Sequence, residues 1–146
     1  MKLGYKGAGC LVLHYSEKTH RVYILLGKRT SGIGAGTWSI PGGGWETKDG
    51  KSLQNTARRE LCEEVFIRVS PNYKLMKIWE SKFTPFFDYS VFAVRLANKI
   101  KIRRWSEFSK VGWFEINKLP NNVFWMVPEQ VKNLVRIMKE RGYQIA

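Results

Sequence analysis

Hydrophobic residues recur at helical spacing in two segments of the chain. The first segment begins after Ser52, a favourable helix N-cap, and runs to about Val65. Its apolar face is formed by Leu53, Ala57, Leu61 and Val65. The second begins near Pro128 and ends at Gly142. Its apolar face is formed by Val131, Leu134, Val135 and Met138. Each segment is predicted to be an amphipathic helix that packs one side on a core.

Short apolar or alternating segments, separated by glycine-rich and polar turns, predict strands elsewhere. The predicted strands cover residues 7–15, 21–29, 38–40, 73–83, 87–97 and 111–116. The fourth and fifth flank Thr84-Pro85 and are predicted to form a hairpin. Strands on both sides of one helix, followed by a second helix, predict an α/β fold in which a mixed β-sheet is sandwiched between helices.

Length and composition fit one globular domain over residues 1–146, because 44% of the residues are apolar. No apolar run approaches the length needed to span a bilayer, and the start lacks a signal-peptide pattern, so we expect no membrane partner. Cys10 and Cys62 lack metal-ligand spacing. We predict that both are reduced, packed thiols in a cytoplasmic protein.

The net charge of +13 predicts polyanionic partners such as nucleotide phosphates, nucleic acid or an anionic surface. Part of this charge lies in a basic run formed by Lys99, Lys101, Arg103 and Arg104. Such a run is either a solvated face or a contact for substrate phosphate or nucleic acid.

A glycine-rich turn and a cluster of carboxylates carry the candidate chemistry. The turn spans Pro41 to Glu46, and Glu60, Glu63 and Glu64 follow at positions i, i+3 and i+4 of the first helix. Like charges so placed repel by roughly 0.2–0.5 kcal/mol per pair. A solvated charged face is one explanation; a hard divalent cation bound by oxygen ligands is the other. The glycines favour the second, since they allow positive φ and a close approach of the backbone to a ligand.

These residues resemble the Nudix box. Gly43, Arg59-Glu60-Leu61, Glu63-Glu64 and Ile67 match its glycine, its arginine-to-glutamate core and its closing aliphatic residue. The likeness to the small MutT-like nucleoside-triphosphate diphosphatases extends beyond the box, to segments 25–29, 34–38, 40–43, 113–114, 119–120 and 134–143. The resemblance covers most of the chain and implies the Nudix fold.

The chain departs from the family pattern at three places. The stretch between Gly43 and Arg59 is two residues longer, the first box glutamate falls on Lys51, and the box glycine falls on Phe66. In the family that first glutamate braces the loop against the helix, so Glu46 or Asp49 is expected to do so here through Arg59. Phe66 predicts that the chain leaves the helix without positive φ.

The resemblance implies hydrolysis of a nucleoside diphosphate linked to another group, with Mg²⁺ or Mn²⁺ as cofactor. The metal ligands that it implies are the Gly42 carbonyl, Glu60, Glu63 (directly or through water), Glu64 and Glu107, with Glu115 as second choice for the last. Arg59 would orient the glutamates. Glu60 is the first choice of general base, and Glu64 is the second.

The substrate would be a nucleoside triphosphate, ordinary or oxidised, cleaved to monophosphate and pyrophosphate. Phosphate contacts are predicted at Lys28 and Arg29, whose other reading is a solvated strand end. The predicted base-stacking platforms are Trp38, Phe83, Phe87 and Trp125, unless these rings belong to the core. Nucleotide sugars, dinucleoside polyphosphates and RNA 5′ ends are alternative substrates. A nucleotide- or RNA-binding module on a degenerate Nudix scaffold is the alternative class, and the family allows a homodimer.

Overall fold

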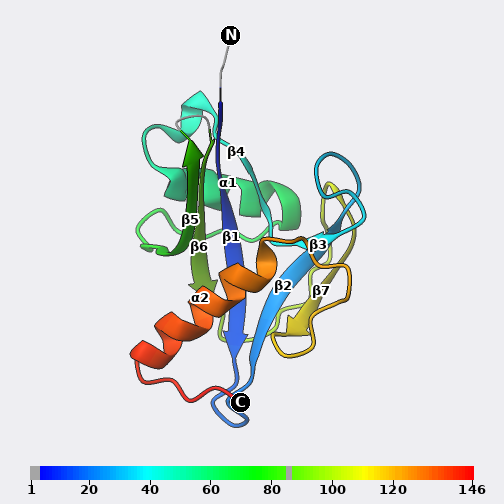
Figure 1. Cartoon of the computed structure of the whole chain (residues 1–146), viewed down its shortest axis with the longest axis vertical. Helices are drawn as coiled ribbons and strands as arrows, with labels where there is room; N and C mark the ends of the chain where they lie inside the picture. Colours follow the sequence, from blue (N-terminus) through cyan, green and yellow to red (C-terminus); the bar gives the residue numbers. More distant parts are fainter. Residues whose placement is uncertain (1–3, 85–86) are drawn as a thin grey trace.

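The structure, a computed structural model, describes residues 4–84 and 87–146, with backbone only for residues 82–84. Within these ranges, seven strands form one mixed sheet. Helix α1 (Leu53–Val65) covers one face and helix α2 (Val127–Glu140) covers the other (Figure 1). The predicted α/β sandwich is therefore confirmed.

The strands are β1 (Tyr5–Tyr15), β2 (Val22–Arg29), β3 (Trp38–Ser39), β4 (Gly42–Gly44), β5 (Met76–Thr84), β6 (Phe87–Arg95) and β7 (Phe108–Glu115). The main path runs β3-β2-β1-β6-β5, with β7 paired to β2 and β4 paired to β1. Strands β1 and β6 are parallel, and the other pairs are antiparallel. The predicted 73–83 and 87–97 hairpin is present as β5 and β6.

One edge of β1 is shared between two partners. Residues Leu13 to Tyr15 pair with β2, whereas Gly7 to Gly9 pair with β4. Between these two stretches, the Cys10 N–H donates a hydrogen bond to the Pro41 carbonyl over 2.8 Å. The glycine-rich segment predicted to be a turn is therefore a short strand. It fills the space where β1 and β2 diverge.

Each helix buries the apolar face that its spacing predicts. Ala57, Leu61 and Val65 of α1 pack against one side of the sheet, and Val131, Leu134 and Met138 of α2 pack against the other. Leu61 and Leu134 have no exposed surface. A fully buried leucine contributes about 1.5–3 kcal/mol, so these contacts fix both helices on the sheet.

The end of α1 corrects a prediction. Phe66 adopts the left-handed conformation, with φ 59° and ψ 32°, and its N–H donates to the Cys62 carbonyl over 3.1 Å. The expectation that a phenylalanine here excludes positive φ is wrong. The left-handed residue supplies the hydrogen bond that ends the helix, and the Arg104 guanidinium covers the Phe66 ring at 4.3 Å. The α2 helix ends as predicted, with Gly142 at φ 92°.

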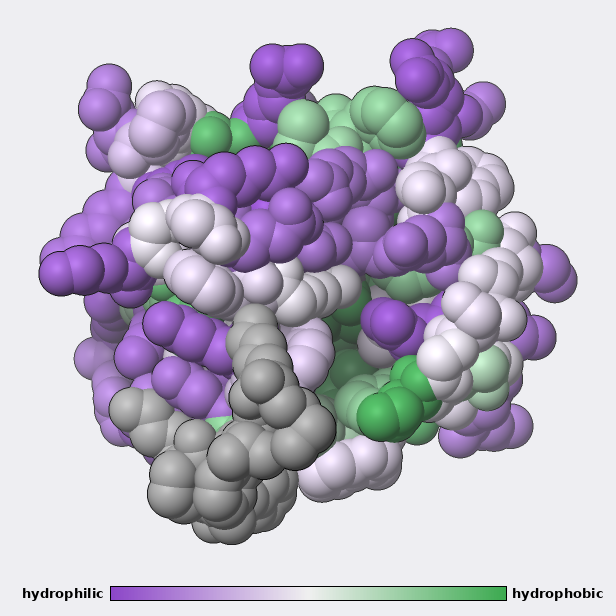
Figure 2. Space-filling model, turned by 90° about the horizontal axis from the view of Figure 1, so that it is seen from above, coloured by the Kyte–Doolittle hydropathy of each residue, from purple (hydrophilic) through white to green (hydrophobic). Residues whose placement is uncertain are grey.

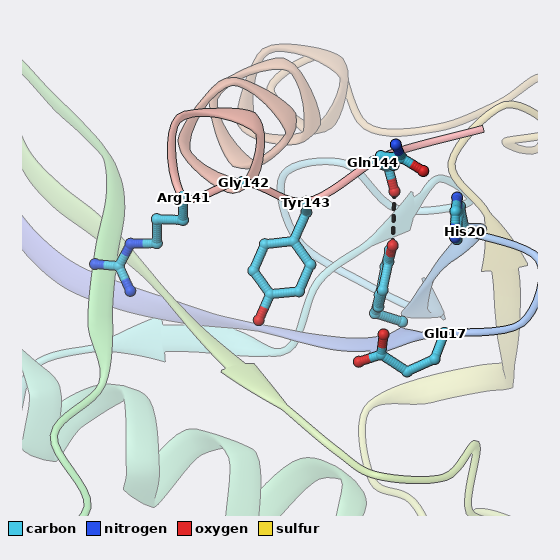
Figure 3. A pocket seen from close by; sticks show the side chains of 7 residues that line it. Glu17, His20, Arg141, Gly142, Tyr143 and Gln144 are labelled. Carbon is cyan, nitrogen blue, oxygen red and sulfur yellow. Dashed lines mark hydrogen bonds between the residues drawn. The ribbon is translucent and has the colours of Figure 1, made fainter.

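The C-terminal segment closes over the end of β1. The Tyr15 hydroxyl donates to the Gln144 carbonyl over 2.7 Å, and a hollow of about 380 Å³ lies beside it (Figure 3). Glu17, His20, Arg141 and Tyr143 border this hollow. Among the described residues, no helix has the length and apolar character needed to cross a membrane.

Candidate active site

Two carboxylates of α1 are buried against β4. Glu64 is 2% exposed, and its Oε1 accepts a hydrogen bond from the Gly42 N–H over 2.6 Å. Its Oε2 is buried without a hydrogen-bond partner among the residues that the structure describes. Glu60, one turn earlier, is 9% exposed. A buried carboxylate oxygen without a donor is costly, so this arrangement favours a positively charged ligand.

The glycines of β4 are needed for close packing. A Cβ on Gly43 would lie 2.5 Å from the Glu60 carboxylate, and a Cβ on Gly42 would lie 2.5 Å from the Tyr89 hydroxyl. Neither glycine is among the residues with positive φ. These two glycines therefore do not use the positive φ that glycine allows, and the close approach of the backbone is made by an extended strand.

Arg59 connects the loop to the carboxylates. Its guanidinium donates to both oxygens of Asp49 over 2.8 and 3.0 Å and to the Gly44 carbonyl over 2.7 Å. The same group lies 2.8 Å from Glu46, 3.0 Å from Glu60 and 3.2 Å from Glu63. It thus holds four acidic side chains in one network.

Asp49 is the innermost acid of this network, at 3% exposure. It ends the 3₁₀ turn η1 (Thr47–Asp49) and accepts from the Glu46 N–H over 3.0 Å and the Thr56 hydroxyl over 2.9 Å. Hydrogen bonds from Arg59 lower its pKa to about 2 despite its burial. Both candidate braces therefore contact Arg59, with Asp49 the more completely bonded, while Lys51 is exposed.

The charge balance of the cluster fits a hard cation. Burial raises the pKa of Glu64 to about 8; the Gly42 N–H and Arg29 lower it, while Glu60 and Glu107 raise it further. Burial also raises the pKa of Glu60. Glu46, Glu60 and Glu63 can place one oxygen each within 4.8 Å of one another. Carboxylate oxygens so gathered suit Mg²⁺ or Mn²⁺. Glu46 was not among the sequence-predicted ligands.

The acid nearest to this cluster from the β7 region is Glu107. It is exposed, directly precedes β7 and contributes to the raised pKa values of Glu60 and Glu64. The loop before it is tied to α1, because the Ser106 N–H donates to the Glu64 backbone carbonyl over 2.8 Å. Glu115 lies at the other end of β7, opposite Tyr23, and is 3.7 Å from Arg21. The structure thus brings Glu107, and not Glu115, to the site.

A cavity of about 450 Å³ adjoins the carboxylates and includes Gly42 and Gly43 in its lining. Figure 2 shows a hollow on this end of the molecule with hydrophobic residues at its floor and both hydrophilic and hydrophobic residues around it. Tyr5, Phe87 and Tyr89 form a stacked aromatic wall, with ring centroids 5.8 to 6.4 Å apart. The size and lining of the cavity suit a flat apolar group such as a nucleobase.

The predicted substrate residues have different locations. Arg29 and Phe87 line the cavity. Lys28 is half-buried in β2, outside this lining, and Trp38 packs edge-on against Phe114 at 4.9 Å on the α2 side of the core. Trp125 is 62% exposed beside Phe124, which does line the cavity. The side chain of Phe83 lies outside the described part of the chain.

The sequence did not predict several other cavity residues, among them Tyr5, Tyr89 and Gln130. Tyr89 had a signal, because it alternates with Ser90 along the predicted strand and shares a face with Phe87. Tyr5 and Gln130 come from opposite ends of the chain. Only the packing of β1 and α2 around the same space brings them together.

Comparison with known proteins agrees with this geometry. The NUDIX domain family model matches residues 6–136. The oxidized purine nucleoside triphosphate hydrolase of Danio rerio is 33% identical over 107 residues, which cover 70% of this chain and 64% of the relative. The Mus musculus protein of the same name is 29% identical over 104 residues, with the same coverage. The chain therefore matches slightly less than two thirds of these relatives.

The fold has a close counterpart among solved structures. A MutT/nudix family protein from Enterococcus faecalis superposes with a TM-score of 0.74 at 14% identity, over 93% of this chain and 62% of that one. The family match spans nearly the whole chain, and the site carries the carboxylate helix of that family. The chain belongs to the Nudix family.

Proposed function

We propose that the protein is a metal-dependent diphosphohydrolase that cleaves a nucleoside triphosphate to monophosphate and pyrophosphate, with oxidised purine nucleotides as preferred substrates. The observation that carries this proposal is the buried Glu64 carboxylate, with one oxygen unpaired among the described residues, beside a cavity of nucleobase size. The names of the zebrafish and mouse relatives support the choice of substrate.

Five residues would hold the cation: Glu60, Glu63, Glu64, Glu107 and the carbonyl of Gly42. Glu46, which can bring an oxygen to Glu60 and Glu63, is a further candidate. A bound divalent cation neutralises the diphosphate oxygens and acidifies water near the scissile bond.

The chain's own side chains supply the rest of the mechanism. Glu60 accepts a proton from the attacking water. The oxygen of this water bonds to the α- or β-phosphorus as the bridging P–O bond breaks, and the leaving group is pyrophosphate in the first case and the nucleoside monophosphate in the second. Its burial suits this role, because a raised pKa brings a carboxylate nearer to the working pH. Arg59 orients Glu60 through a 3.0 Å contact, and Arg29 faces the negative charge from the cavity wall. Glu64 is the alternative base.

The test is a substrate screen with Mg²⁺ or Mn²⁺ over nucleoside triphosphates, 8-oxo-purine triphosphates, nucleotide sugars, dinucleoside polyphosphates and 5′-triphosphate RNA. Products are separated by ion-exchange chromatography, with the Glu64→Gln variant as control. We expect the wild type to release pyrophosphate from 8-oxo-dGTP and the Glu64→Gln variant to release none. Absence of metal-dependent turnover with every substrate would overturn the proposal. Tight RNA binding without turnover would favour a binding module.

A further inference from the structure

Two buried polar side chains, those of Gln130 and Ser39, line the cavity. Gln130 is 2% exposed and its Oε1 is buried; Ser39 is 5% exposed and its Oγ is buried. Neither atom has a hydrogen-bond partner among the described residues. Buried polar atoms in folded proteins are nearly always paired, so two orphans in one cavity wall mark a place where a ligand supplies the missing hydrogen bonds.

The two groups belong to elements that form a wall of their own. Gln130 lies in the first turn of α2, where its N–H donates to the Met126 carbonyl over 3.2 Å. Met126 and Val127 from the same turn also line the cavity. Ser39 ends β3, next to the cavity residue Ile40. The rest of this wall is therefore apolar, and a ligand there meets a few polar atoms in a dry setting.

The same cavity reaches the catalytic helix and the aromatic wall. Its lining includes Gly43, which is packed against the Glu60 carboxylate, and the stacked rings of Tyr5, Phe87 and Tyr89. A nucleotide with phosphates at the carboxylates can therefore extend its base into the cavity. A primary amide presents an acceptor and a donor side by side, which matches the edge of a base.

We propose that Gln130, supported by Ser39, is the specificity-determining residue of this site and accepts a hydrogen bond from the N7–H of the bound base. This rests on the proposed function, since it assigns the nucleobase to this cavity. A purine oxidised at carbon 8 carries an N–H at N7, where the ordinary purine has a bare acceptor. The unpaired Gln130 oxygen therefore favours the oxidised purine over the ordinary one.

Binding of nucleoside monophosphates tests the proposal without turnover. Affinities of the full chain for 8-oxo-dGMP, dGMP, dAMP and dCMP are measured by calorimetry, without added metal. The wild type should bind 8-oxo-dGMP at least about tenfold more tightly than dGMP, and Gln130→Met should remove most of this preference. Ser39→Ala should reduce it less. Gln144→Met, in the separate hollow beside the C-terminal segment, is the matched control and should leave it unchanged.

Melting temperatures show whether each variant is folded. If Gln130→Met is unfolded, Gln130→Glu and Ser39→Ala are used instead, and the ratio of their affinities for 8-oxo-dGMP and dGMP is compared with that of the wild type. An unchanged ratio in folded Gln130→Met, or a wild type that binds none of the monophosphates, would overturn the inference. If the monophosphates follow the expected pattern but no triphosphate is hydrolysed, the proposed function fails while the base-recognition role of Gln130 stands.

Discussion

The Glu64 carboxyl group is held in surroundings that oppose its ionisation. Burial raises its pKa to about 8, far above its ordinary value. Between about pH 5 and pH 8 the folded protein therefore binds more protons than the unfolded chain, and the free energy of unfolding falls as pH rises. If Glu64 binds the cation as proposed, this loss of stability is the cost of keeping a buried carboxylate in the site.

Glu64→Gln should remove that cost together with the activity. In metal-free buffer at pH 8 we expect the variant to melt at a higher temperature than the wild type, with a smaller difference at pH 5. Its kcat/KM should fall at least about 100-fold, as expected when a group that stabilises the transition state is lost. Calorimetry and pyrophosphate release measure the two effects. A lower melting temperature at pH 8, or unimpaired turnover, would contradict this assignment.

Asp49 shows the opposite behaviour. Because Arg59 holds its pKa at about 2, it contributes stability above the ordinary pKa of an aspartate, and this contribution is lost as pH falls from about 4 toward 2. At pH 7 we expect Asp49→Asn to lower the free energy of unfolding by about 2 kcal/mol.

Urea denaturation at pH 7 and at pH 3 measures this contribution, which should shrink at the lower pH. Lys51→Ala is the matched control two residues along the chain. Lys51 is exposed, so its removal should change stability by less than about 0.5 kcal/mol. If Lys51→Ala proved as harmful as Asp49→Asn, the brace would have been placed on the wrong residue.

At the scale of elements, β4 and α1 form the site by packing closely together. Gly43→Ala would put a methyl group 2.5 Å from the Glu60 carboxylate, whereas a Cβ on Gly44 meets nothing nearer than 3.8 Å. We expect Gly43→Ala to lower kcat about tenfold or more and to weaken activation by Mg²⁺, since a shift of about 1 Å in a catalytic group can cost this much. Gly44→Ala should retain wild-type kinetics. Equal effects of the two substitutions would show that the clash with Glu60 does not matter.

The end of α1 gives a second test at this scale. A left-handed phenylalanine costs free energy that glycine avoids, although Phe66 also contacts Arg104. We expect Phe66→Gly to raise the free energy of unfolding by up to about 1 kcal/mol and to leave kcat unchanged. A destabilised variant would mean that the contact with Arg104 outweighs the backbone cost. In either case, having Phe66 in place of the family's glycine would change the stability of the protein and not its catalysis.

The elements differ in how far the sequence could predict them. The two helices were predictable because their apolar spacing is a local property of the chain. The β4 strand was not, because three glycines carry no side-chain alternation and the strand exists through its pairing with Gly7 to Gly9. The prediction for Phe66 was wrong for a similar reason. The hydrogen bond that ends the helix outweighs the preference of a phenylalanine for negative φ.

The residues of the site also differ in how far the sequence could predict them. Spacing along one helix placed Glu60, Glu63 and Glu64 together. Glu46 and Asp49 could be named as the shifted loop acids because they are the only acidic residues between Gly43 and Arg59 in the sequence. Trp38 shows the limit: its aromatic character could not tell a stacking platform from the core contact with Phe114 that the structure has. The cavity wall formed by Tyr5 and Gln130 depends on tertiary packing alone.

At the scale of the whole molecule, the charges are unevenly distributed. Half of the 12 acidic residues belong to the site: Glu46, Asp49, Glu60, Glu63, Glu64 and Glu107. The rest of the surface is therefore strongly basic, and Lys99, Lys101, Arg103 and Arg104 are all exposed on one loop. Contacts of Arg104 with Phe66 and of Ser106 with the Glu64 carbonyl place this loop beside the carboxylate end of α1.

This distribution should steer anionic substrates to the site. Steering raises the rate at which the substrate and the protein meet. Salt weakens it, because at 0.1 M exposed charges more than about 10 Å apart interact little. We therefore expect kcat/KM for the preferred triphosphate to fall steeply between 50 and 500 mM NaCl, while kcat changes little. The double variant Lys101→Gln/Arg103→Gln should flatten this dependence. Lys132→Gln/Lys139→Gln removes the same net charge from exposed positions on α2 and should flatten it less. Equal slopes for the two double variants would mean that net charge, and not the position of the basic loop, guides the substrate.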